Sequence, residues 1–215
     1  MSDLFLPQRF SWTSRVKGLP KEPKTSDLGP VRDALLEVTD AAGGLEYSRG
    51  QLGRAIAVAQ EEFDDARKGM PALCEGIWGG RNTPPVYYEF CNAVAWTRTV
   101  KDRYADRLLP AVQHDADLVL RLQKIRAGAN AELEDARKLA QCGLHKYTPP
   151  YPLAGAKLVE GGQLIYPVPI ITNPSDFRAN LGNMPAGRHA VSLVEGFWGA
   201  VNHLINGLLD VFYPG

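Results

Sequence analysis

The stretch Gly187–Tyr213, with the sequence GRHAVSLVEGFWGAVNHLINGLLDVFY, decides the fold of this chain. Its large apolar side chains recur at the three- and four-residue spacing of an α-helix. They run from Val194 to Phe212 and cover a very wide face rather than one narrow stripe. A helix that is apolar over so much of its circumference is buried by other elements. We therefore expect the last helix to be central to the core, or to be partly buried by another subunit.

Helical periodicity also extends over four earlier segments, residues 31–68, 86–109, 111–126 and 130–143. In the first segment one apolar stripe ends at Leu45 and a second begins at Leu52, with Gly43 and Gly44 close to the junction. Each glycine costs about 1 kcal/mol relative to alanine inside a helix. We expect either one long helix that bends at the glycines or two helices that meet there. Gly143 is expected to cap the C-terminus of the fourth segment.

The convincing β signal lies just before the last helix. Two short strands, Ala156–Glu160 and Gln163–Tyr166, are predicted on either side of two consecutive glycines, which suit a tight hairpin turn. The chain is therefore predicted to be an all-α bundle of about five helices with one β-hairpin, at about residues 156–166, inserted before the last helix. Residues 31–215 would form a single helical domain.

The N-terminal residues 1–30 differ from the rest of the chain. They contain four prolines, which favour extended and irregular backbone. Phe5, Phe10 and Trp12 are too apolar for a fully solvated tail, so we expect them to dock on the body of this chain or on a neighbouring subunit. A second segment rich in glycine and proline, residues 69–85, is predicted to be a loop.

The composition argues against several classes of protein. Among 215 residues, 24 basic and 24 acidic side chains give a formal charge of zero, which disfavours a nucleic-acid coat protein or a polybasic membrane binder. No run of about 18 apolar residues occurs, so we expect a cytoplasmic protein without membrane contact. Three cysteines without a C-x-x-C pair disfavour a disulfide scaffold and a structural zinc site. We expect no metal or cofactor.

The candidate chemistry lies where the fourth helical segment ends. Arg137, Cys142 and His145 bring a guanidinium, a thiol and an imidazole within nine positions. An arginine could hold a phosphodiester through two parallel hydrogen bonds, and an imidazole could move a proton near neutral pH. The alternative is structural: Arg137 pairs with Glu134 one turn back, Cys142 belongs to the core, and His145 bonds a loop carbonyl.

This segment, followed by a proline-containing loop and a final helix, resembles the HEPN superfamily (higher eukaryotes and prokaryotes nucleotide-binding). The mark of that family is an arginine, four variable residues and a histidine, often with a polar residue directly after the arginine. Here Arg137 has the right spacing, Lys138 follows it, Cys142 stands at the histidine position, and His145 comes three residues later.

The resemblance implies a homodimer in which the motif helices of two protomers form a composite groove. It also implies a metal-independent RNA endonuclease of toxin–antitoxin or defence type, in which the histidine assists attack of the RNA 2′-hydroxyl and the arginine steadies the phosphate. A thiol with a pKa near 8.5 is a poor general base at pH 7. Catalysis would therefore use His145, or the site is inactive.

The sequence also allows other functions. Cys142 could act as a nucleophile with His145 as its base, but the C-terminal end of a helix disfavours a thiolate. His114 and Asp117 could share a helix face as metal ligands. A basic run could track an RNA backbone, or form a solvated face paired with acids; it comprises Arg121, Lys124, Arg126, Arg137 and Lys138. A non-enzymatic assembly module, built on the apolar last helix and the aromatic arm, is the alternative function.

Overall fold

The last helix lies at the centre of the fold, as its apolar face predicts. The computed structural model describes residues 29–70, 76–144, 157–168 and 188–213. Helix α8 (Ala190–Phe212) packs against α2 (Gly29–Gly69), α3 (Thr83–Arg103), α5 (Ala116–Ala127) and α6 (Asn130–Leu144). Its buried side chains include Leu193, Phe197 and Leu204, none of which is measurably exposed. The prediction of an all-α bundle of about five helices is confirmed for these ranges.

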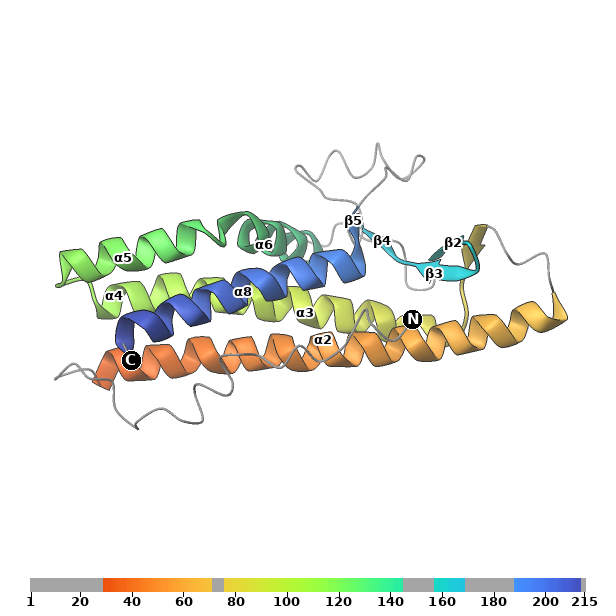
Figure 1. The fold of residues 1–215 in the computed structure, drawn as a ribbon, viewed down its shortest axis with the longest axis horizontal. Coiled ribbons are helices and arrows are strands. Elements are labelled where there is room, and N and C mark those ends of the chain that lie inside the picture. The colour runs from red at the N-terminus through yellow and green to blue at the C-terminus, as the bar shows by residue number, and fades with distance from the viewer. Residues whose placement is uncertain (1–28, 71–75, 145–156, 169–187, 214–215) are drawn as a thin grey trace.

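The helices form an elongated bundle (Figure 1). α2 lies along one edge for most of the length of the bundle, while α5 and α6 follow one another along the opposite side. α2 and α3 are antiparallel neighbours. At one end of the pair Arg103 lies 3.0 Å from Glu37, and at the other the backbone N–H of Asn82 donates to Glu62 over 2.9 Å. That carboxylate satisfies an N–H at the start of α3, where a helix leaves such donors unpaired.

α2 is one continuous helix of 41 residues, so the alternative of two helices meeting at the glycines is wrong. The reason lies in the packing between α2 and α3. A Cβ atom at Gly44 would lie 2.4 Å from the ring of Trp96, whereas a Cβ at Gly43 would meet nothing within 4 Å. Gly44 therefore lets an indole ring lie against the α2 backbone, and the gain in packing offsets the low helix propensity of glycine.

The chain stays helical after α3 through a five-residue π-helix, η2 (Tyr104–Leu108), and the short α4 (Leu109–Ala111). α5 begins at Ala116 rather than at the predicted residue 111, because Asp115 acts as its N-cap and accepts a hydrogen bond from the N–H of Leu118 over 2.9 Å. α6 includes Gly143 and ends at Leu144, so the predicted cap lies one residue inside the helix end.

The predicted hairpin is confirmed as β2 (Lys157–Glu160) and β3 (Gln163–Ile165), which pair antiparallel. Its turn residues Gly161 and Gly162 have φ values of 56° and 80°, the positive angles that a type I′ turn requires. Two further strands, β4 (Pro167–Val168) and β5 (Arg188–His189), pair just before α8.

A third strand, β1 (Gly76–Trp78), joins this hairpin and lies within the segment predicted to be a loop. The sheet is fixed to α2 by Gln60, whose side-chain oxygen accepts from the N–H of Leu164 over 2.9 Å. The amide nitrogen of Gln60 donates to the carbonyl of Gly162 over 3.1 Å. The hairpin is therefore part of the packed body of the protein. Figure 1 shows it beside the C-terminal half of α2.

Among the described helices, none combines the length and the apolar character that crossing a membrane requires.

Candidate functional site

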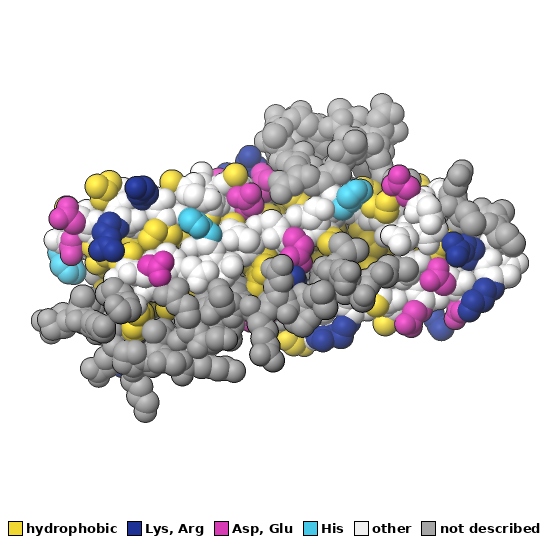
Figure 2. Space-filling model, in the orientation of Figure 1, with side chains coloured by type: hydrophobic (Ala, Val, Ile, Leu, Met, Phe, Trp, Pro, Cys, Tyr) yellow, Lys and Arg dark blue, Asp and Glu magenta, His cyan; other side chains and the backbone are white. Residues whose placement is uncertain are grey.

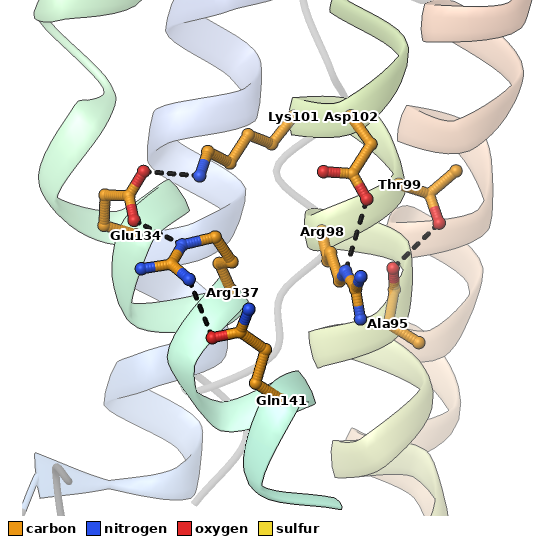
Figure 3. Close-up of polar contacts among 8 residues, drawn as sticks. All are labelled: Ala95, Arg98, Thr99, Lys101, Asp102, Glu134, Arg137 and Gln141. Carbon is orange, nitrogen blue, oxygen red and sulfur yellow. Dashed lines mark hydrogen bonds and ion pairs between the residues drawn. The ribbon is translucent and has the colours of Figure 1, made fainter. Parts of the chain in front are cut away.

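Arg137 lies on α6 and is held by two neighbours on the same helix. Its Nε atom donates to Glu134 over 2.6 Å, and one terminal nitrogen donates to the side-chain oxygen of Gln141 over 2.7 Å (Figure 3). The pairing with Glu134 is the structural alternative that the sequence offers for this arginine. The Arg137 side chain nevertheless keeps 34% of its surface exposed. It is oriented by its partners but not enclosed.

Glu134 connects α6 to α3 through a second cation. Lys101 of α3 forms an ion pair with the other carboxylate oxygen of Glu134 (Figure 3). Lys101 is only 7% exposed, which is rare for a lysine unless it is paired. Lys101, Glu134 and Arg137, hereafter the α3–α6 ion network, thus place one carboxylate between two cations. Sequence spacing could not predict the Lys101 contact, because it depends on how α3 and α6 pack.

The network shifts the pKa of Glu134 to about 2. The hydrogen bond from Lys101 is the largest cause, burial opposes it, and the contacts with Arg137 add to it. Because the folded pKa lies below the unfolded value, the network stabilises the fold at pH values above about 4.5. That contribution is lost as the pH falls through about 2 and the carboxylate is protonated.

The remaining members of the predicted catalytic set are not placed relative to Arg137. The backbone of Cys142 lies in the last turn of α6, but its side chain lies outside the described residues, and so does His145. The approach of His145 to Arg137 that a phosphodiester site requires stays a prediction.

The predicted basic run is divided between two helices. Arg121 and Lys124 are exposed on α5, Arg126 is partly buried on the same helix, and Lys138 is partly buried on α6. Figure 2 shows basic and acidic side chains interspersed over the visible face, rather than gathered into one basic patch. On that face the mixed charges give no strong local field for a polyanion.

The metal pair suggested by the sequence is not assembled in the described residues. His114 lies before the N-cap of α5 and Asp117 inside that helix, so the two do not share a helix face. No group of three or more potential metal ligands occurs in the described part of the chain. Trp78 packs edge-on against Phe63 of α2, with ring centroids 5.4 Å apart, and so belongs to the packing between sheet and helix.

A feature that the periodicity analysis missed is an exposed apolar face on α2. Leu36, Tyr47 and Val58 are 50%, 66% and 47% exposed. They recur every 11 residues, which is three helical turns, so they lie on one side of the helix. Two large residues of α3, Tyr88 and Trp96, are also exposed, at 60% and 40%. The signal was present in the sequence, but the inward stripes of α2 dominate its pattern.

Comparison with known proteins gives no family for this chain. No family model, no curated protein and no solved structure matches it.

Proposed function

We propose that this chain is a helical assembly module that forms a homodimer through the exposed face of α2. The observation that carries the proposal is the symmetry of that face about Tyr47. Leu36 and Val58 lie 11 residues before and after Tyr47, and Asp40 and Arg54 lie seven residues before and after it. A twofold dimer uses the same surface patch on both subunits, so such a patch has to be complementary to itself.

The pairing follows from this spacing. If two copies of α2 cross antiparallel at Tyr47, Leu36 of one protomer faces Val58 of its partner, at both ends of the contact. Asp40 likewise faces Arg54, so that opposite charges meet twice. All five residues lie within about 20° of one line along the helix, at 100° per residue. The α2 face is defined here as Leu36, Asp40, Tyr47, Arg54 and Val58.

Small residues favour a close approach of the two backbones. Gly43 and Gly50 lie next to this line, and a Cβ at either would meet nothing within 4 Å. Tyr47 can pack over this low surface, and tyrosine supplies a large contact area at low entropic cost. A stable interface buries about 800 Å² on each partner, more than one helix face supplies. Trp96, which rests against Gly44, and Tyr88 would extend the contact onto α3.

The test is the mass of the protein in solution, measured by sedimentation for the wild type and for Tyr47→Glu. The matched control is Leu120→Glu, which places the same charge at an equally exposed apolar residue of α5; Leu120 is 67% exposed. We expect the wild type and the control to be dimers and Tyr47→Glu to be a monomer. A monomeric wild type, or a Tyr47→Glu variant that stays dimeric, would contradict the proposal.

RNA cleavage by a HEPN-like site is a second proposal. It is supported by Arg137, whose guanidinium is oriented by Glu134 and Gln141 and yet partly exposed. A preoriented arginine suits recognition of a phosphate. Cleavage of a mixed RNA pool in EDTA should be lost in Arg137→Ala and His145→Ala. The matched control is Arg98→Ala, because Arg98 is likewise paired within its own helix, to Asp102 over 3.2 Å (Figure 3). Arg98 lies on α3, outside the motif, so cleavage should persist in this variant.

The two proposals differ in the interface that they require. A HEPN-like dimer would join the motif helices, whereas the assembly module joins two copies of α2. Lys138→Glu should therefore dissociate the first kind of dimer and leave the second intact. If the wild type leaves RNA intact in EDTA, the nuclease proposal fails for that RNA pool and the assembly proposal is unaffected.

A further inference from the structure

Three residues that carry hydrogen-bond donors lie side by side on the inner face of the sheet. Trp78 of β1 and Lys157 of β2 are direct partners across the two strands. The pairing of Leu158 with Ile165 places the next residue, Tyr166, opposite Lys157. Because side chains on paired positions point to the same face of a sheet, the three share one face. We call Trp78, Lys157 and Tyr166 the donor row.

This face is directed toward α2, as the contact of Trp78 with Phe63 shows. Lys157 is only 2% exposed and Tyr166 is 8% exposed. The Lys157 ammonium lies 5.2 Å from the centre of the Tyr166 ring, a cation–π contact. The inner face of a small sheet thus holds a positive charge where an apolar side chain would be expected.

The donor row has no acceptor of its own in the described part of the chain. The indole nitrogen of Trp78 and the hydroxyl of Tyr166 are both buried there without a hydrogen-bond partner. Nor does any carboxylate of the described residues form an ion pair with Lys157. Buried donors are nearly always paired, and an unpaired buried charge is costly. The arrangement therefore calls for an acceptor that this part of the chain does not supply.

Glu62, whose charge acts on Tyr166, already has hydrogen-bond partners of its own. Both oxygens of Glu62 accept backbone N–H groups at the start of α3, from Arg81 over 3.1 Å and from Asn82 over 2.9 Å. Burial alone lowers the pKa of Lys157 to about 8, with no carboxylate opposing the shift. Burial, and then the charge of Glu62, raise the pKa of Tyr166, so its hydroxyl remains a donor at neutral pH.

We propose that the donor row is a binding site for a small oxyanion, either a carboxylate or a phosphate. Such a group offers several acceptor oxygens to an ammonium, a phenol O–H and an indole N–H at once. It also neutralises the charge that burial of Lys157 leaves uncompensated. Carboxylate and phosphate share this chemistry and are distinguished by experiment.

The experiment measures the thermal unfolding midpoint of the full chain during titration with acetate and, separately, with inorganic phosphate, with sodium chloride holding the ionic strength constant. We expect one of the two anions to raise Tm by several degrees once it reaches about a hundredfold excess over its Kd. Lys157→Met should lose the response. Lys124→Met, which removes an exposed lysine of α5, should retain it.

Two further measurements keep the test decisive. Tyr166→Phe removes one donor and preserves the ring, so it should weaken the response of Tm without abolishing it. In nuclear magnetic resonance titrations the pKa of Lys157 should rise when the effective anion is added. The proposal is overturned if neither anion moves Tm or the pKa of Lys157, which would mean that water alone serves the donor row. It is also overturned if Lys157→Met responds as strongly as the wild type.

Discussion

Lys101 and Lys157 are almost equally hidden from solvent, at 7% and 2% exposed, yet their surroundings differ. Lys101 has a carboxylate partner, Glu134, whose second oxygen is bonded by Arg137. Lys157 has an aromatic ring beside it, and burial lowers its pKa. A buried cation with a partner ties two helices together. A buried cation without a partner destabilises the fold, so its presence indicates a role in binding rather than in stability.

The sequence motif indicates only the region around Arg137, in the α3–α6 ion network, and not the region around Lys157. Arg137 belongs to a motif with a family resemblance, and yet its surroundings are those of a structural ion network. Lys157 belongs to no motif, and its surroundings are those of a binding site. Buried polar side chains without a hydrogen-bond or charge partner are better indicators of a binding site than side chains whose partners lie within the protein.

The largest effect is expected from removing the charge that holds the α3–α6 ion network together. Glu134→Gln leaves both Lys101 and Arg137 without a counter-charge. We expect a loss of about 3 kcal/mol in the free energy of unfolding, the lower end of the cost of breaking a buried pair, because Glu134 is partly exposed. Urea denaturation measures this loss. Glu132→Gln, which removes a charge from the same helix, should change the stability by less than about 1 kcal/mol.

An effect of opposite sign is expected at the other lysine. Lys157→Met removes a desolvated charge and keeps a side chain of similar length, so it should stabilise the protein by about 2 kcal/mol in the absence of added anions. Lys101→Met should destabilise it, because Glu134 then keeps only one of its two cations. If both substitutions shift the urea midpoint in the same direction, the distinction between the two lysines fails.

The smallest expected effect is a dependence on alkaline pH. The pKa of Lys157 falls from 10.5 in its ordinary state to about 8 in the fold, so the unfolded chain binds more protons between these values. Stability contributed by this group therefore rises with pH across the window. Between pH 8 and 9 the wild type should gain about 1 kcal/mol relative to Lys157→Met. A constant difference between the two proteins over this range would show that Lys157 titrates normally.

Much of the fold follows from the sequence, because its signals are local. The apolar face of α8 and the two glycines of the hairpin each specify one element through spacing or through positive φ. β1 could not be predicted, since three residues are too short for an alternating pattern and the strand forms only against β2. Gly44 suggests a bend or a break in the helix for a similar reason. Its role is to make room for Trp96, a residue more than 50 positions away, which local sequence does not reveal.

The sites show the same limit. The contact between Arg137 and Glu134 was among the expected alternatives, because three residues along a helix make one turn. Lys101 and Glu134 meet only through tertiary packing. Lys157 lies two residues before the buried Val159 and therefore on the same face of β2, so its inward position is implied by the hairpin. A lysine at such a position is ordinarily assigned to the solvent side, which is why the donor row was missed.

The assembly function is tested most directly by charge reversal on the α2 face. Asp40→Arg would set two pairs of positive charges against each other across the twofold axis, and Arg54→Asp would do the same with negative charges. The combined variant restores opposite charges with their positions exchanged. Sedimentation should therefore give a monomer for each single variant and a dimer for the double variant. If the double variant is no more dimeric than the single ones, the antiparallel pairing of α2 about Tyr47 is wrong.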